Sequence, residues 1–137
     1  MMNMQKVGIA GAFEHVKDER IDKLSVEINR LRKDYNLEHI KVKFKFVKGA
    51  GRASFITNTI TLPLWMLDYL EAFQYAYIVH ELTHFIVGIT ELHNENFKRK
   101  ESEILLREYG IRIDYKKAYL NCLRDFDGDI LYAGRKK

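Results

Sequence analysis

The chain of 137 residues has one cysteine and one proline, and it lacks a long apolar run. Cys122 has no second cysteine with which to form an internal disulfide or a paired-thiolate metal site. We therefore expect a reducing, cytoplasmic setting, with Cys122 as a buried thiol. Charged residues and histidines interrupt the longest apolar region, which falls short of the roughly 20 apolar residues of a membrane span. We expect a soluble protein with no membrane partner.

The composition is that of a globular protein. Apolar residues make up 47% of the chain, aromatic residues 12% and charged residues 31%. This mixture differs from the low-hydrophobicity composition of disordered chains, so a core can form. The length fits one compact domain of about 100 to 150 residues, and no linker or repeat interrupts it. We predict a single domain over residues 1–137.

The chain is mildly basic, with a formal charge of +4. Part of the excess is local, because Lys41, Lys43 and Lys45 alternate along one expected strand and residues 135–137 form a basic tail. The simpler interpretation is a strand face and a tail in water, since charge runs usually face solvent. Weak DNA binding through the three lysines is the second interpretation.

Hydrophobic periodicity predicts the elements of the first half of the chain. Apolar residues recur every three or four positions over 18–35, which indicates an amphipathic helix that Asn36 ends. Strict alternation over 40–47 indicates a strand with one wet face. Strands over 52–57 and 60–62, joined by a turn, then predict a small antiparallel sheet that Pro63 ends.

The second half is expected to be mainly helical. The pattern predicts a short helical turn over 64–70, a central helix over 71–89, a helix around 97–109 that ends at Gly110, a short extended piece, a helix around 116–123 and a turn at Asp127 and Gly128.

The central helix carries a metal-binding motif, because residues 80–84 read HELTH and so match HExxH. Residues four apart lie on the same face of a helix, which places the imidazoles of His80 and His84 beside one ion. Glu81 lies next to that face and can hold a metal-bound water without being a ligand. The motif therefore predicts one zinc ion per chain, with Glu81 as the catalytic base.

A catalytic zinc ion has three protein ligands as a rule, and the third must come from after the motif. Glu91 would lie roughly 10 Å along the helix axis from His84, out of reach unless the helix breaks. His93 comes within reach if the chain turns near Gly88, and it is the preferred candidate. Glu101 or Glu103 of the following helix is the alternative. Thr90 stands where the metzincin pattern requires histidine.

From residues 52 to 111 the sequence resembles the SprT-like zinc metallopeptidases. The resemblance is carried by the strand residues 51–55 and 60–62, by the HELTH motif, and by His93 followed by Phe97. It differs in Asn94, where the family often has glycine directly after the third histidine. It implies an α+β, zincin-like fold in which a small antiparallel sheet packs on the HExxH helix with flanking helices.

The resemblance also implies the chemistry of a zinc-dependent endopeptidase. Zinc activates a water molecule, Glu81 takes its proton, and the water attacks the scissile carbonyl. DNA-associated proteins are candidate substrates, and the strand over 52–57 is the candidate edge for pairing with an extended substrate. Tyr109 and Tyr115 are candidates for a second oxyanion donor, although core positions are the more usual place for such tyrosines.

Two rival functions stay open. One is a regulatory peptidase with a single protein target, as in ImmA/IrrE-like proteins, which also use HExxH. The other is a non-catalytic module stabilised by zinc that binds nucleic acid. An acidic residue directly after the first histidine is not needed in a structural site, so Glu81 favours catalysis.

Overall fold

The computed structural model describes residues 18–90, 92–116, 120 and 122–133. The chain forms two compact units, Met1–Leu67 and Asp68–Lys137, and each is described by itself. The prediction of a single domain over residues 1–137 stays a prediction. Glu91 and the basic tail at 135–137 lie outside the described residues.

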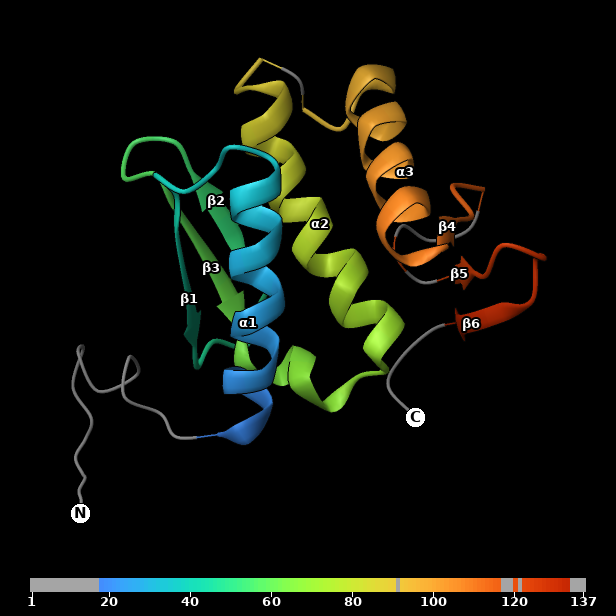
Figure 1. The fold of residues 1–137 in the computed structure, drawn as a ribbon, viewed down its shortest axis with the longest axis horizontal. Helices are drawn as coiled ribbons and strands as arrows, with labels where there is room; N and C mark the ends of the chain where they lie inside the picture. Colours follow the sequence, from blue (N-terminus) through green and yellow to red (C-terminus); the bar gives the residue numbers. More distant parts are fainter. Residues whose placement is uncertain (1–17, 91, 117–119, 121, 134–137) are drawn as a thin grey trace. The chain divides into compact units, whose positions relative to one another are not determined.

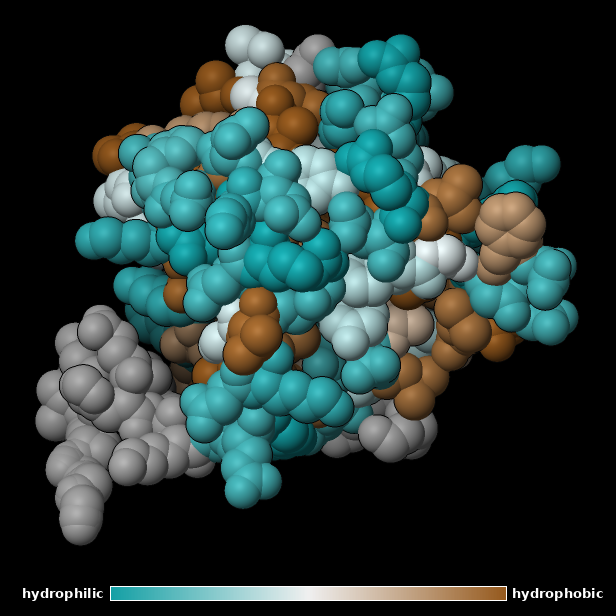
Figure 2. Space-filling model, in the orientation of Figure 1, coloured by the Kyte–Doolittle hydropathy of each residue, from teal (hydrophilic) through white to brown (hydrophobic). Residues whose placement is uncertain are grey.

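The described part of the first unit begins with helix α1, Glu19–Asp34 (Figure 1). Asp18 caps its N-terminus by accepting a hydrogen bond from the backbone of Arg20 at 2.9 Å. Asn36 has φ 59°, a left-handed conformation that asparagine tolerates, and the chain leaves the helix there as predicted. The apolar face is buried through Leu24, Ile28 and Leu31, whereas mainly hydrophilic side chains cover α1 in Figure 2.

The sheet of the first unit has the order β1-β3-β2. Its strands are β1 (Lys41–Lys45), β2 (Arg52–Ser54) and β3 (Thr59–Pro63). Strand β2 is antiparallel to β3, but β1 is parallel to β3. The prediction of an antiparallel sheet was therefore wrong for one of the two pairings.

Strand β1 pairs in parallel with β3 because β3 lies between β1 and β2 in the sheet. The chain reverses after β1 and again after β2, so β1 and β3 run in the same direction, and β3 lies between its two predecessors. Gly51 permits this arrangement, because a Cβ atom there would collide with the backbone carbonyl oxygen of Thr61. If each strand had paired with the next one along the chain, β3 would have been at the edge of the sheet.

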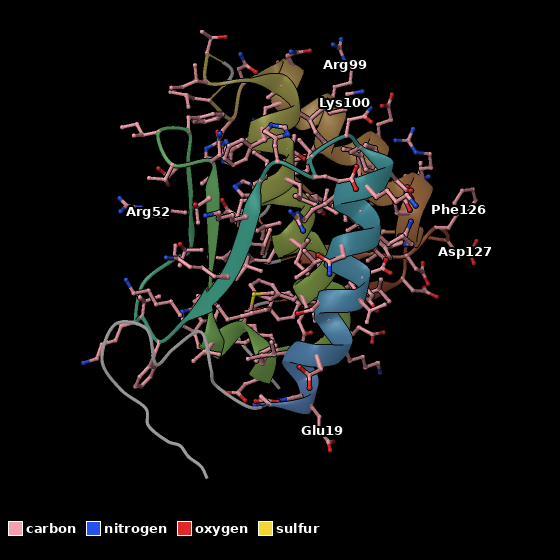
Figure 3. All side chains as sticks on the ribbon, turned by 60° about the vertical axis from the view of Figure 1, so that its left-hand side comes forward. Glu19, Arg52, Arg99, Lys100, Phe126 and Asp127 are labelled. Atoms are coloured by element: carbon pink, nitrogen blue, oxygen red, sulfur yellow. The ribbon has the colours of Figure 1, made fainter. Side chains whose placement is uncertain are left out.

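The edge strands of this sheet carry basic residues. Lys41, Lys43 and Lys45 of β1 are exposed, in agreement with the predicted wet face. Arg52 of β2 projects outward from the opposite edge (Figure 3). Phe46 lies within the strand predicted over 40–47, two residues after buried Phe44, but the observed strand ends at Lys45 and Phe46 is exposed. The 3-10 helix η2, Leu64–Asp68, follows β3 where a helical turn was expected.

The second unit contains helices α2 (Glu71–Val87) and α3 (Glu95–Tyr109), which contact each other. Helix α2 ends at Gly88, whose φ of 97° is costly for residues with a side chain. The last helical residue, Val87, lies two residues before the predicted end at Ile89, so Ile89 falls outside the helix and is exposed. Helix α3 ends at Gly110 in the left-handed conformation, as predicted.

A second sheet completes this unit, with strands β4 (Arg112–Ile113), β5 (Cys122–Arg124) and β6 (Ile130–Ala133). All its pairings are antiparallel. The helix predicted around 116–123 was wrong where the chain is described, because Cys122 and Leu123 pair with β4 and β6. Residues 117–119 and 121 lie outside the described residues. The predicted turn at Asp127 and Gly128 joins β5 to β6, and Cys122 is buried.

None of the helices in the described part of the chain is long and apolar enough to cross a membrane.

Candidate metal centre

Helix α2 presents His80 and His84 one turn apart, as the HExxH spacing predicts. Both side chains are partly exposed, whereas Glu81 and Thr83 between them are buried. Thr83 donates its hydroxyl proton to the carbonyl oxygen of Val79 at 2.6 Å, which satisfies this buried polar group within the helix. The helix thus exposes two imidazoles and keeps the intervening polar groups inside.

The connection from α2 to α3 returns His93 to the two histidines of α2. The chain turns after Gly88, and His93 itself has φ 53°, in the left-handed region that histidine visits more readily than most residues. Asn94 follows as the N-cap of α3 and accepts a hydrogen bond from the backbone of Phe97 at 3.0 Å. His93 is therefore held by the conformation of the helix start.

The three imidazoles meet at their Nε2 atoms. Nε2 of His93 lies 3.2 Å from Nε2 of His80 and 3.2 Å from Nε2 of His84. Two ligands at 2.0–2.1 Å from a tetrahedral zinc ion are separated by about 3.3 Å. Among the described residues, these histidines form a group that can hold a metal ion.

The contact between His80 and Glu101 also favours metal binding by the three histidines. Nδ1 of His80 lies 2.8 Å from Oε2 of Glu101. A carboxylate only accepts hydrogen bonds, so Nδ1 carries the proton and Nε2 of His80 keeps its lone pair. That lone pair faces the other two imidazoles, an arrangement that a cation stabilises. The donor set of three imidazoles suits zinc.

The surroundings of His84 and His93 favour the neutral form of both imidazoles. The pKa of His84 is lowered to about 4, chiefly by burial, and neighbouring His80 and His93 contribute to this shift. Burial also lowers the pKa of His93. Neutral imidazole is the form that binds metal, so these two histidines are ready to bind at neutral pH in the metal-free protein.

Glu81 is 6% exposed and occupies the position after His80. Burial raises the pKa of this carboxyl group to about 7, since loss of water penalises its charged form. His80 opposes the rise and Glu101 adds to it. A carboxyl group whose pKa lies near neutral pH can both take up and release a proton, which is what a general base and acid requires.

Phe97 forms an apolar wall beside the three histidines. It is fully buried, and its ring centroid lies 5.1 Å from that of His80, 4.6 Å from that of His84 and 4.9 Å from that of His93. The resemblance to SprT-like peptidases singled out this phenylalanine. Its ring limits the orientations of the imidazoles and reduces the access of water to them.

Glu101 and Glu103, the alternative third ligands, have different surroundings. Glu101 is fully buried and contacts Nδ1 of His80, on the side of that ring away from Nε2. Glu103 is exposed and pairs with Lys100 at 2.9 Å. Neither carboxylate takes the place that His93 occupies, and Glu101 acts on the site through His80.

The sequence reasoning did not identify Glu101 as the partner of His80. The available signal was its position four residues after Phe97, on the same face of α3 as buried Ile104 and Leu105. A glutamate in an apolar stripe requires a hydrogen-bonding partner. The partner itself depends on how α3 packs against α2.

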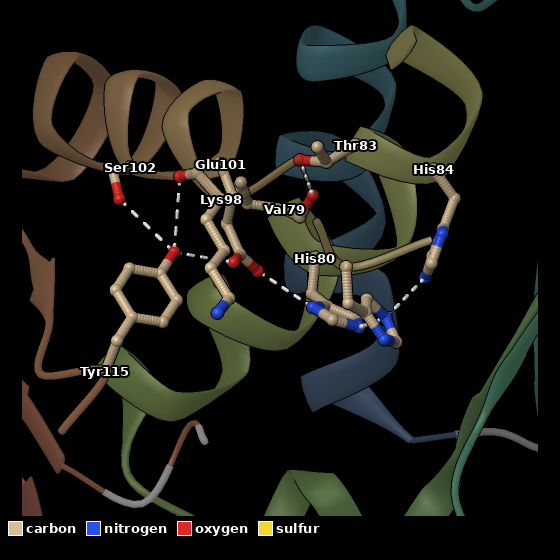
Figure 4. Close-up of polar contacts among 9 residues, drawn as sticks. Val79, His80, Thr83, His84, Lys98, Glu101, Ser102 and Tyr115 are labelled. Atoms are coloured by element: carbon tan, nitrogen blue, oxygen red, sulfur yellow. Dashed lines mark hydrogen bonds and ion pairs between the residues drawn. The ribbon is translucent and has the colours of Figure 1, made fainter. Parts of the chain in front are cut away.

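The two candidate oxyanion donors are engaged elsewhere. The hydroxyl of Tyr115 donates to Oε1 of Glu101 at 2.8 Å (Figure 4). The ring of Tyr109 stacks on Tyr75, with centroids 4.2 Å apart and an interplanar angle of 5°. Tyr115 therefore contacts the site from behind Glu101, and the stacking of Tyr109 agrees with a packing role.

Two archaeal metallopeptidase zymogens have a similar fold. Jannalysin of Methanocaldococcus jannaschii is 25% identical, with a TM-score of 0.51 over 69% of this chain and 83% of its own. Abylysin of Pyrococcus abyssi is 24% identical, with a TM-score of 0.51 over 60% of this chain and 79% of its own. No protein-family model matches the chain, and curated proteins give no significant match. Together with the three-histidine group, the shared fold is that of a zincin-like metallopeptidase.

Proposed function

We propose that this protein is a zinc-dependent endopeptidase. The observation that carries the proposal is the convergence of three Nε2 atoms, 3.2 Å apart in two of the pairs, next to a buried glutamate of the same helix. His80, His84 and His93 would hold one zinc ion and leave its fourth position open. The similar fold of the two zymogens supports a peptidase over other metal-dependent activities.

The chemistry divides between the ion and the chain. A bound zinc ion would supply a Lewis acid that polarises a water molecule and the scissile carbonyl group. The carboxylate of Glu81 accepts a proton from the attacking water and then delivers it to the leaving amine nitrogen. Glu101 holds the ring of His80 by its Nδ1 proton, and Phe97 limits the access of bulk water to the imidazoles.

The direct test replaces Glu81 with glutamine. This change keeps the size of the side chain and removes its basicity, so we expect cleavage of unfolded protein substrates to fall by about 10²–10⁴-fold. Zinc content should stay at one ion per chain. The matched control is Glu71→Gln, an exposed position in the first turn of the same helix, which should retain activity. Unchanged proteolysis in Glu81→Gln would remove the proposed role of Glu81.

The third ligand has its own test. His93→Ala should lose zinc or bind it much more weakly, as measured by elemental analysis after dialysis. A variant that keeps one tightly bound zinc ion would show that His93 is not a ligand. A wild-type protein that binds zinc and cleaves no substrate under any condition would instead support the rival function, a zinc-stabilised module.

Within this function, the narrower assignment is a SprT-like peptidase acting on DNA-associated proteins. It is supported by the spacing from HELTH to His93 and Phe97, and by the exposed lysines of strand β1, Lys41, Lys43 and Lys45. The test compares cleavage of one substrate protein free and bound to DNA, using wild type and a triple Lys→Gln variant of β1. Equal cleavage of both substrates would leave a general endopeptidase, and cleavage of a single cellular target would indicate a regulatory peptidase.

A further inference from the structure

Tyr115 is linked to His80 through Glu101, although it lies in the C-terminal sheet region beyond the segment that resembles SprT-like peptidases. Its hydroxyl lies 2.8 Å from Oε1 of Glu101, and the second oxygen of the same carboxylate lies 2.8 Å from Nδ1 of His80. Figure 4 shows the three side chains in line, from the loop after β4 through α3 to α2. Each of the two carboxylate oxygens thus accepts one of these hydrogen bonds.

The hydroxyl proton of Tyr115 can reach more than one acceptor in the described part of the chain. Among these are Oε1 of Glu101 at 2.8 Å, Oγ of Ser102 at 3.2 Å and the carbonyl oxygen of Lys98 at 3.3 Å. A charged acceptor at the shortest distance forms the strongest hydrogen bond, so the proton lies toward Glu101. Burial raises the pKa of Tyr115 above its usual value, and the Glu101 carboxylate adds to the rise, so the hydroxyl keeps its proton at neutral pH.

The carboxylate of Glu101 depends on such donors because its side chain has no exposed surface. A buried carboxylate requires compensating hydrogen bonds. Without the hydroxyl of Tyr115, Oε1 would lose a donor and the carboxylate would lose a contact that fixes its orientation. A rotated carboxylate would accept the Nδ1 proton of His80 less well, and this hydrogen bond fixes the lone pair of His80 on Nε2.

The loop that carries Tyr115 is held by the C-terminal sheet. The backbone N–H of Asp114 donates a hydrogen bond to the carbonyl oxygen of Cys122 at 3.0 Å. Its side-chain Oδ1 accepts a hydrogen bond from the backbone N–H of Lys116 at 3.1 Å. The side chain of Asp114 also pairs with Arg124 at 3.5 Å. Tyr115 therefore reaches Glu101 from a loop tied to β5.

We infer that Tyr115 is a positioning residue of the metal centre, which orients Glu101 and thereby keeps His80 in the tautomer and orientation that bind metal. This inference rests on the proposed function, because it names an additional residue that controls the same site. It also assigns the C-terminal sheet the role of holding Tyr115 in place.

The experiment measures zinc affinity in Tyr115→Phe by competition with a chelating indicator. Phenylalanine keeps the ring and removes only the hydroxyl, so we expect roughly a threefold to tenfold loss of affinity, below the about 10–100-fold typical of a direct partner of a ligand. Ser102→Ala is the matched control, since it removes a hydroxyl 3.2 Å from that of Tyr115 but leaves the Glu101 contact intact. Its affinity should equal that of the wild type.

A double-mutant cycle with Glu101→Gln separates positioning from general destabilisation. If Tyr115 acts through Glu101, removing its hydroxyl in the Glu101→Gln background should cost little further affinity. Additive losses, or wild-type affinity in Tyr115→Phe, would overturn the inference.

A second readout needs neither zinc nor peptidase activity. Nitrogen NMR of the metal-free protein should show His80 in the Nδ1-protonated tautomer in the wild type and a mixture of tautomers in Tyr115→Phe. An unchanged tautomer would also overturn the inference. Failure of the proposed function would give a different result. Glu81→Gln would then retain proteolysis, while Tyr115→Phe would still show the tautomer shift of His80.

Discussion

Helices α1 and α2 are almost equal in length, with 16 and 17 residues, but they differ in their N-caps and in the residues that they bury. Helix α1 has a side-chain cap at Asp18, a buried apolar face and exposed ion pairs such as Arg30 with Glu27 at 2.6 Å. Helix α2 has no side-chain cap at Leu70 and buries Glu81 and Thr83. Each feature of α1 is a common source of stability, whereas α2 keeps polar groups where they cost stability.

This difference indicates which helix carries function. A buried glutamate next to two converging imidazoles lowers the stability of the metal-free protein, and a bound metal ion can offset that cost by binding the folded state. Substitutions in α2 and in its partner α3 should therefore change metal binding and pH dependence. Substitutions on the exposed face of α1 should change only stability, and by little.

The largest effect is expected for His84→Ala. This variant removes one of the three proposed ligands, so zinc affinity should fall by more than the about 10–100-fold typical of an outer partner. Elemental analysis and chelator competition measure it. His39→Ala, an exposed histidine of the first unit, should keep one zinc ion per chain. Equal affinities of the two variants would mean that the Nε2 cluster is not the metal site.

Glu101→Gln should have the next largest effect. The amide cannot accept the Nδ1 proton of His80 with the strength of a charged group, so we expect about a 10–100-fold loss of zinc affinity. Glu103→Gln is the control on the same helix, because Glu103 is exposed and pairs with Lys100. If both variants bound zinc like the wild type, the contact between Glu101 and His80 would have no role in binding.

Buried Glu81 of α2 should make the free energy of unfolding depend on pH. In the metal-free folded state the pKa of Glu81 is raised from 4.5 to about 7, so folding favours its protonated form. The contribution of the Glu81 carboxyl group to the free energy of unfolding is fully present below pH 4.5 and is lost as pH rises through 7. Glu81→Gln should therefore unfold like the wild type near pH 4 and be more stable by on the order of 2–3 kcal/mol near pH 8. Urea unfolding in the presence of a chelator measures both values, and equal stability at pH 8 would contradict the burial cost.

His84 should produce the opposite pH dependence of stability in the same protein. The pKa of His84 is lowered from 6.5 to about 4, so the unfolded state takes up the proton first as pH falls. Stability from this source is present above pH 6.5 and declines as pH falls through about 4. Metal-free His84→Ala should consequently lose less stability than the wild type between pH 6.5 and 4. A steeper loss in the variant would show that another group controls this range.

The smallest effect is expected for Arg30→Ala on the exposed face of α1. Its ion pairs with Glu27 and Asp34 are largely solvated, and such pairs contribute about 0.5 kcal/mol or less. Zinc affinity should not change. A change in metal binding here would show that α1 also influences the metal centre.

Much of the local structure could be predicted from the sequence. The helix periods over 18–35 and 71–89, the helix ends at Asn36 and Gly110, and the turn at Gly128 depend on neighbouring residues only, and the structure contains each of them near the predicted position. The errors fell on Cys122 and Leu123, which lie in a strand instead of the predicted helix, on the pairing of β1 with β3, which is parallel, and on Ile89, which is exposed. Strand β5 is determined by pairing with β4 and β6, which no local pattern encodes.

The sequence by itself determined that His80 and His84 share one face of a helix with Glu81 between them, because helical geometry fixes residues four apart. Tertiary structure decided the rest of the site. The backbone at Gly88 and His93 returns the third imidazole to that face, and the packing of α3 on α2 brings Glu101 to His80. The loop after β4 places Tyr115 on Glu101. These contacts join residues 9 to 21 positions apart, whose distances depend on dihedral angles and packing summed over the intervening chain.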